Sequence, residues 1–329
     1  MTGIAIVGQG YMGRTHAEAW TELNFGDEIR YINAPGERAW TDLAPNAEFT
    51  EDLDEVLFDP EVTAVSVCTP TPSHADITVR ALSAGKHVLL EKPIALTLED
   101  AARIAAAAEK SDRVVMVAQV VRFFEGYASL LNIATSGELG EVRAVRASRA
   151  LAKPQWAPWW PDHAQSGGPL VDFSIHDFDQ ANLFLGVPIA VTATQSGTDG
   201  PYEITIEYRD GGVAQILSHP FLPQASPFTS TIDVAGTQGM ASYRLIAGAP
   251  TDGGEGTNLS EITKTTPVGV TRIDVSDNRP YTQEVAYFLD CIRKGTRPAR
   301  SDVRSSMVAL SVSLAARTSL ETGAKVLVG

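Results

Sequence analysis

The chain has 329 residues, of which 44% are hydrophobic and 20% charged, so it is long enough for two folded domains. Its net charge of −14 argues against nucleic acid and anionic membranes as general partners, because neutralising phosphates requires a basic surface. The only cysteines, Cys68 and Cys291, cannot form a zinc cluster and favour a reducing compartment. The first residues enter a strand pattern without a leader, and no apolar run reaches the about 18 residues of a membrane span, so we expect a cytoplasmic protein.

Short β-branched runs alternate with helical segments in the first part of the chain. This alternation predicts a parallel sheet with helices on both faces. The predicted strands are residues 4–7, 29–32, 62–67, 87–90 and 114–118, and the predicted helices are residues 51–59, 74–84, 98–111 and a helix from residue 12 onward.

After residue 121 the pattern changes to paired strands. Residues 202–219 read YEITIEYRDGGVAQILSH, where two alternating strands flank Asp210-Gly211, a strong hairpin signal. Residues 229–245 repeat this form, and helices are predicted over 282–294 and 302–322. We therefore predict an α/β chain with a dinucleotide-binding domain over residues 1–121. An α+β domain with an open, mainly antiparallel sheet, for substrate binding and oligomerisation, is predicted over residues 122–329.

The segment IAIVGQGYMG places Gly8, Gly10 and Gly13 directly after a strand and at the start of a helix. In this G-x-G-x-x-G pattern the glycines permit a tight turn, close backbone approach to a pyrophosphate, and close packing of helix on strand. Tyr11 and Met12 begin that helix and are candidate cofactor contacts. The pattern on its own also fits a simple loop, but its position at the start of a βαβ unit favours a Rossmann-type cofactor site.

The residue that would read the cofactor's ribose is less clear. Asn33 stands where an acidic residue would bind the 2′-hydroxyl of NAD. Arg38 follows in the same loop and could meet a 2′-phosphate, which would suit NADP, although it could equally be a solvated arginine. The cofactor is therefore predicted to be NAD or NADP, with a slight preference for NADP.

Residues 167–186 read GGPLVDFSIHDFDQANLFLG, and on a helix Asp172, His176 and Asp179 would form one polar edge. Three interpretations compete for this edge. It could be a metal site, since histidine and carboxylates are good ligands, or a solvated surface, or an acid–base pair beside a cofactor.

Two stretches carry a resemblance to a known family. Residues 67–95, VCTPTPSHADITVRALSAGKHVLLEKPIA, and the GGPLVDFSIHDFD segment resemble the Gfo/Idh/MocA family of oxidoreductases. The glycine pattern, a T-P…H segment, an E-K-P triplet and a D-x-x-x-H helix occur in the family's order. The resemblance implies an NAD(P)-dependent enzyme that transfers a hydride between nicotinamide and a secondary alcohol or carbonyl of a sugar, cyclitol or related polyol.

The resemblance also implies roles for individual residues. Lys92 would be the active-site lysine, and it follows a predicted strand whose carboxyl end is where ligands bind in open α/β sheets. A lysine there can stabilise charge on a substrate oxygen. Arg122 would contact substrate. The implied cofactor contacts are Thr69, Pro70, His74, Glu91, Lys92 and Gln119.

For such an enzyme the acid–base interpretation of the polar edge is preferred. Histidine can take and return a proton near neutral pH, so His176 is the predicted general base and acid, with Asp172 as its partner. Both would also bind substrate, together with Lys92. Asp177 and Asp179 are interpreted as solvated, and no metal is predicted.

The stretch KPQWAPWWPDHAQSGG, residues 153–168, carries Trp159 and Trp160. Tryptophan faces stack on the C–H faces of sugar rings, so both are candidate substrate contacts. The alternative is a proline-rich loop fixed to the core by its aromatic side chains.

Two other functions remain as alternatives. A non-catalytic dinucleotide-sensing regulator would not need Lys92, Asp172 and His176 together, whereas an NAD-dependent glycosidase would use the cofactor only transiently. A one-layer sheet leaves a second face to bury, so a homodimer or homotetramer is expected.

Overall fold

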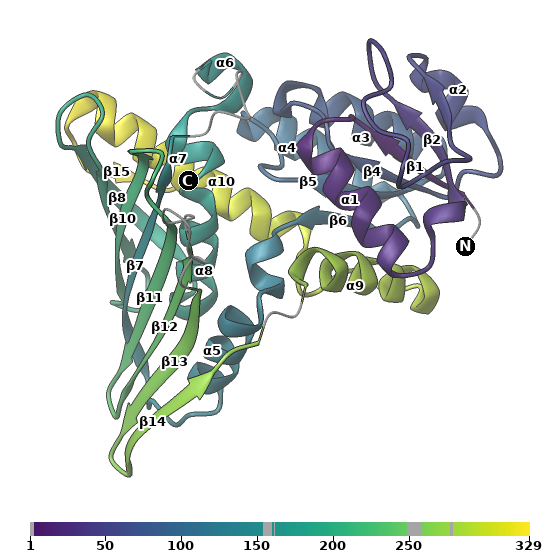
Figure 1. The fold of residues 1–329 in the computed structure, drawn as a ribbon. Helices are drawn as coiled ribbons and strands as arrows, with labels where there is room; N and C mark the ends of the chain where they lie inside the picture. Colours follow the sequence, from purple (N-terminus) through teal and green to yellow (C-terminus); the bar gives the residue numbers. More distant parts are fainter. Residues whose placement is uncertain (1–2, 154–159, 161, 249–257, 277–278) are drawn as a thin grey trace. The chain divides into compact units, whose positions relative to one another are not determined.

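The computed structural model describes residues 3–153, 160, 162–248, 258–276 and 279–329. They form two compact units (Figure 1), which we call unit 1 (Met1–Phe123 and Arg279–Leu310) and unit 2 (Phe124–Asn278 and Ser311–Gly329). The first boundary lies close to the predicted residue 121. The segment Arg279–Leu310, however, packs with unit 1, whereas the sequence pattern assigned it to the second domain.

Unit 1 contains a six-stranded parallel sheet in the order β3-β2-β1-β4-β5-β6, as the strand–helix alternation predicts. The strands read as continuous apolar runs because both faces of such a sheet are covered. The strands are β1 (Ile4–Val7), β2 (Ile29–Asn33), β3 (Glu48–Thr50), β4 (Ala64–Val67), β5 (His87–Glu91) and β6 (Val115–Ala118). The three-residue strand β3 was not predicted.

Helices pack on this sheet in pairs, α1 with α9 and α3 with α4. Trp20 on α1 has no exposed surface, and its ring meets that of Phe288 on α9 edge-on, with centroids 6.4 Å apart. The C-terminal segment therefore completes the core of unit 1. The helices are α1 (Tyr11–Glu22), α2 (Leu53–Phe58), α3 (His74–Ser83), α4 (Leu98–Lys110) and α9 (Pro280–Lys294), with 3₁₀ turns η1 (Gly26–Glu28), η2 (Thr71–Ser73) and η3 (Val120–Phe123).

Unit 2 contains a nine-stranded sheet in the order β14-β13-β12-β11-β7-β10-β9-β8-β15, antiparallel except where β7 and β10 pair in parallel. Both predicted hairpins are confirmed, β9 with β10 and β11 with β12. Gly211 in the first turn has a φ of +82°, which suits glycine. The strands are β7 (Val142–Ala152), β8 (Pro188–Gln195), β9 (Tyr202–Tyr208), β10 (Val213–Leu222), β11 (Phe228–Gly236), β12 (Met240–Ala247), β13 (Leu259–Thr266), β14 (Gly269–Asp274) and β15 (Val326–Leu327).

Helices α5 and α8 lie along one face of this sheet, α8 over β7 and β10 and α5 over β12 and β13 (Figure 1). Burial alternates along β9, as expected for strands with one covered face. Among the described helices, none is both long and apolar enough to cross a bilayer. The remaining helices are α5 (Glu125–Thr135), α6 (His163–Ser166), α7 (Pro169–Asp172), α8 (Ile175–Leu185) and α10 (Val303–Thr322).

Candidate functional site

The surroundings of a Cβ atom differ among the three glycines of the motif after β1. A Cβ at Gly8, where φ is +103°, would lie 2.5 Å from the Cys68 carbonyl oxygen, and one at Gly13 would lie 1.9 Å from that of Gly8. Both are therefore required by packing within the chain. A Cβ at Gly10 would meet nothing within 4 Å. Its bare backbone faces open space, which is what close approach of a ligand requires.

The turn at Gly10 also presents a helix N-terminus. Among the described residues no side chain caps α1, and its first turn carries no acidic residue. The first amide groups of a helix bind anions when no side chain satisfies them. The pyrophosphate of a dinucleotide therefore fits this turn. Tyr11 is 60% exposed at the start of the helix, and Met12 is half-buried.

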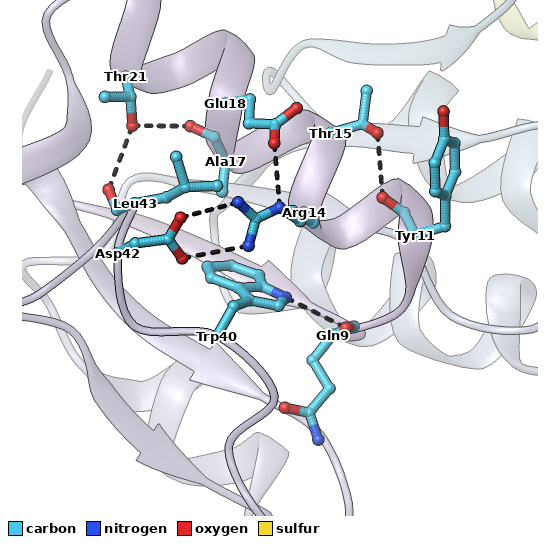
Figure 2. Close-up of polar contacts among 10 residues, drawn as sticks. All are labelled: Gln9, Tyr11, Arg14, Thr15, Ala17, Glu18, Thr21, Trp40, Asp42 and Leu43. Atoms are coloured by element: carbon cyan, nitrogen blue, oxygen red, sulfur yellow. Dashed lines mark hydrogen bonds and ion pairs between the residues drawn. The ribbon is translucent and has the colours of Figure 1, made fainter. Parts of the chain in front are cut away.

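The loop after β2, residues 34–42, is fastened to this turn by Gln9. The Gln9 side-chain amide donates to the carbonyl oxygens of Pro35 and Glu37, at 3.1 and 2.9 Å, and its oxygen accepts from the amide of Ala39 at 2.8 Å. In return, the Trp40 indole donates to the Gln9 carbonyl oxygen at 3.1 Å (Figure 2). The loop that would border the cofactor's ribose is therefore held at both of its ends.

Arg38, the predicted reader of a 2′-phosphate, has hydrogen-bond partners within the chain. Each of its three guanidinium nitrogens donates to a backbone carbonyl oxygen, those of Trp40 at 3.0 Å, Ala47 at 3.1 Å, and Ala44. Asn33 at the end of β2 is buried, and its side-chain amide donates to the Thr50 carbonyl oxygen at 3.0 Å.

The second arginine near the turn is neutralised by acidic side chains. Arg14 on α1 donates to both carboxylate oxygens of Asp42, at 3.1 and 2.7 Å, and to Glu18 at 3.0 Å (Figure 2). Its charge is therefore shared with two carboxylates. Sequence reasoning missed Arg14 and Asp42, because they are brought together only by the course of the β2 loop.

The turns that follow β4 and β5 are joined by His74. Its Nδ1 lies 2.9 Å from the Pro93 carbonyl oxygen, and its Nε2 lies 2.9 Å from that of Thr69. Burial lowers the pKa of His74, so the ring is neutral near pH 7 and only one of its nitrogens can donate. His74 thus donates to one of these two carbonyl oxygens and lies against the other, between Thr69 and the turn that carries half-buried Lys92.

Glu91, a predicted cofactor contact, is buried and has partners on both carboxylate oxygens within unit 1. Oε1 lies 3.0 Å from His16 Nε2, and Oε2 accepts a hydrogen bond from the Lys92 backbone amide at 3.0 Å. The contacts of Glu91 are therefore internal. His16 was missed by sequence reasoning because it is 75 residues from Glu91.

Gln119 and Arg122 follow β6 and have different surroundings. Gln119 is 1% exposed, and neither its side-chain nitrogen nor its oxygen has a hydrogen-bond partner among the described residues. Such groups are costly to bury, so a bound molecule or water that pairs with them is favoured. Arg122, the predicted substrate contact, is buried and donates to the Arg300 carbonyl oxygen at 2.6 Å. Arg300 in turn donates to the Arg122 carbonyl oxygen, so Arg122 anchors the C-terminal segment of unit 1.

In unit 2 the predicted polar helix is broken in two. Asp172 ends α7 and His176 lies in the first turn of α8, with Phe173 and Ser174 between the helices. Both polar side chains are half-buried. Asp172 accepts a hydrogen bond from the Trp160 indole, with Nε1 and Oδ2 2.9 Å apart.

Trp160 therefore belongs to the core beneath the helices. It is 4% exposed, and its ring packs edge-on against that of Phe221 at 6.1 Å. This agrees with the alternative interpretation of the tryptophan stretch, and the substrate contact of Trp160 stays a prediction. Trp159 lies outside the described residues.

The interpretation of Asp177 and Asp179 as solvated is wrong. Neither has more than 1% of its surface exposed. Asp177 is paired with Arg149 of β7, at 2.8 and 2.9 Å, and Arg149 also donates to the Tyr127 hydroxyl at 3.2 Å. A charge is stable in the interior when it is paired in this way.

Two family models match this chain. The model described as "Oxidoreductase family, NAD-binding Rossmann fold" matches residues 2–119, and that of the "GFO/IDH/MocA C-terminal domain" matches residues 127–242. The chain belongs to the GFO/IDH/MocA oxidoreductase family. This confirms the resemblance and the fold class inferred from the sequence motifs, and with them an oxidoreductase that uses a nicotinamide dinucleotide.

Relatives within this family act on sugars and inositols. The scyllo-inositol 2-dehydrogenase (NAD(+)) of Bacillus subtilis (strain 168) is 26% identical to this chain over 97% of this chain and 94% of its own. The D-glucoside 3-dehydrogenase of Escherichia coli (strain K12) is 33% identical over 56% of this chain and 54% of its own.

Solved structures of this family share the fold. That of GenD2 from gentamicin A biosynthesis, in complex with NAD, is 27% identical, with a TM-score of 0.84 over 100% of this chain and 96% of that one. The aldose-aldose oxidoreductase from Caulobacter crescentus, complexed with glycerol, is 21% identical, with a TM-score of 0.83 over 99% of both chains.

Proposed function

We propose that this enzyme oxidises a secondary hydroxyl group of a sugar, cyclitol or related polyol with NAD, or reduces the corresponding ketone with NADH. The open Gly10 turn carries this proposal, because it is the one glycine of the motif that packing within the chain does not explain. The substrate class is supported by the names of the inositol and glucoside dehydrogenases similar to this chain.

NAD is proposed over NADP, against the slight preference for NADP drawn from Arg38. A 2′-phosphate needs positive charge and free donors beside the ribose. Arg38 donates three hydrogen bonds to backbone carbonyl oxygens, and Arg14 is paired with Asp42 and Glu18, so both guanidinium groups already have partners within the chain. Acidic Glu37 in the same loop would further repel a phosphate.

Lys92, His176 and Asp172 supply the chemical groups of the proposed reaction. A nicotinamide dinucleotide held at the Gly10 turn would supply the hydride chemistry. Lys92, at the carboxyl end of β5, hydrogen-bonds the reacting oxygen and stabilises charge on it. His176 removes the hydroxyl proton during oxidation and returns it during reduction. Asp172, fixed by the Trp160 indole, orients His176 or binds a neighbouring hydroxyl.

Cofactor titration tests the first part of this proposal. Isothermal titration of the purified protein with NADH and NADPH separately is expected to give clearly tighter binding for NADH. Tighter binding of NADPH would overturn the cofactor assignment. If neither binds, the function itself is wrong.

Turnover tests the second part. The protein with NAD is offered scyllo-inositol, myo-inositol and simple glucosides, and absorbance at the NADH band is followed. His176→Ala is expected to lower kcat by about 10²–10⁴-fold, the usual loss for a positioned acid–base group. The control is His87→Ala, since the His87 ring accepts a hydrogen bond from the Val114 amide, just before β6, and lies in unit 1. NADH binding without turnover of any substrate would favour a regulator, and release of free sugar without net NADH would favour a glycosidase.

A further inference from the structure

We propose that Glu91 is a positioning residue for Lys92, and that His16 holds Glu91 in the orientation this requires. The proposal rests on the proposed function, because it presumes that Lys92 acts on the substrate. Glu91 itself touches neither substrate nor cofactor in this scheme. It acts by fixing the peptide group from which the lysine side chain extends.

The position of Lys92 in the chain explains why its amide needs a partner. The pairing of β5 with β6 ends at Glu91, opposite Ala118, so Lys92 is the first residue beyond the strand. A backbone amide at a strand end loses the regular partner that the sheet supplied. Glu91 Oε2 accepts from this amide at 3.0 Å. The Glu91 carboxylate therefore supplies the acceptor that a neighbouring strand would otherwise give the Lys92 amide.

The other carboxylate oxygen of Glu91 contacts helix α1, which begins at the Gly10 turn. Oε1 lies 3.0 Å from Nε2 of His16, on the helix whose N-terminus opens at Gly10. Both side chains are nearly fully buried, with 1% and 7% of their surface exposed. Water therefore competes little for either contact, and the orientation of the carboxylate is fixed from two directions.

Four other titratable groups of the described chain interact electrostatically with Glu91 or with its neighbour Glu284. Burial and the charge of Glu91 raise the pKa of Glu284 on α9 well above its usual value, which favours the neutral carboxyl. Burial and the same charge raise the pKa of the Cys68 thiol, which is neutral too. His74 is kept neutral by burial. Arg300 is the cation that opposes the shift at Glu284.

Amide hydrogen exchange tests the contact directly. In wild-type protein the Lys92 amide is expected to exchange slowly, and Glu91→Ala is expected to speed its exchange. Glu91→Gln keeps an oxygen for the Lys92 amide and an NH₂ group for His16, so it is expected to restore protection. Equal exchange rates at Lys92 in wild type and Glu91→Ala would overturn the proposal.

Steady-state kinetics, with whichever substrate the turnover assay identifies, test whether Glu91 affects catalysis. Glu91→Ala is expected to lower kcat by about 10- to 100-fold, the scale of a small misplacement of a catalytic group, with the NADH dissociation constant little changed. Glu91→Gln is expected to recover most of this loss. The matched control is Ser66→Ala, which removes the acceptor of the buried Trp20 indole at 3.2 Å and should lower stability but leave kcat unchanged.

A double-mutant cycle separates this proposal from the proposed function. If Glu91 acts through Lys92, the double variant Glu91→Ala with Lys92→Met should be no slower than Lys92→Met alone. Multiplying losses would show that Glu91 acts independently and would overturn the proposal. If Lys92→Met keeps full activity, the proposed role of the lysine fails. If Lys92→Met loses activity but Glu91→Ala keeps the wild-type kcat, only the positioning role fails.

Discussion

Arg149 of β7 and Asp177 of α8 form a two-point ion pair whose side chains are 5% and 1% exposed. The pair fixes the first turn of α8 against the sheet of unit 2, and His176 is the residue just before Asp177. A local contact thus links the stability of this unit to the placement of its proposed base.

Removing one member of this pair is expected to lower the free energy of unfolding strongly. Asp177→Ala leaves the Arg149 charge buried and unpaired, which costs about 3–5 kcal/mol in comparable cases. Urea unfolding of the variant should show a loss of this size. The comparison is Asp42→Ala at the exposed Arg14 pair, where a much smaller loss is expected because water screens exposed charges. Similar losses in the two variants would contradict this account.

Gly10 and Gly13 should respond differently to substitution. Gly10→Val is expected to keep the wild-type melting temperature, because a side chain there meets open space, but to lose NADH binding. Gly13→Val would push its side chain into the Gly8 carbonyl oxygen and should prevent folding of unit 1. Melting curves and NADH titration distinguish the two. Wild-type NADH affinity in Gly10→Val would mean that the turn binds no cofactor.

Trp160→Phe isolates the indole contact with Asp172. Phenylalanine keeps an aromatic ring against Phe221 but cannot donate to the Asp172 carboxylate. We expect kcat to fall by about 10- to 100-fold, since a net hydrogen bond to a charged group is worth about 1.5–3 kcal/mol. NADH affinity should be unchanged because the contact lies within unit 2. Loss of NADH binding would point to a broader structural effect.

Glu284→Gln should make the protein more stable at alkaline pH. Glu284 is buried with neither carboxyl oxygen partnered among the described residues, and burial raises its pKa well above the usual value. In the unfolded chain the Glu284 carboxyl has the usual pKa of about 4.3. In the folded chain the raised pKa means that it keeps its proton to higher pH. The free energy of unfolding therefore falls as the pH rises from the unfolded-state pKa of Glu284 to its higher folded-state pKa.

The corresponding measurement is unfolding at several pH values. Glutamine cannot ionise, so the variant should exceed wild type at pH 8 and approach it toward pH 4. Glu99→Gln, at the exposed start of α4, serves as the control. A difference in stability that is the same at every pH would refute the proposed ionisation of Glu284.

Local patterns predicted the parts of the fold that depend on local chemistry. The strand–helix alternation gave the parallel sheet, and Asp210-Gly211 gave the hairpin between β9 and β10. Short β3 was missed because three residues carry almost no periodic signal. The break after Asp172 was missed because the apolar pattern continues across it.

The rest of the site depends on partners distant in the sequence. Asp177 resembled a solvated residue because its partner Arg149 is 28 residues away on a strand. The contacts of Arg38 could not be predicted because its acceptors are backbone carbonyl oxygens, which every sequence has. Lys92, Asp172 and His176 were predicted from motifs, and their catalytic roles stay predictions, as does the oligomeric state.

The return of the chain to unit 1 has a consequence for the order of synthesis. The ribosome makes Met1–Phe123 first, yet the hydrophobic core around Trp20 also needs Phe288 and Leu289 from α9. The part of this core that α9 covers therefore stays exposed while all of residues 124–278 is translated. A premature stop anywhere in that stretch yields an exposed apolar surface, which chaperones and proteases recognise, and never a small functional cofactor-binding fragment.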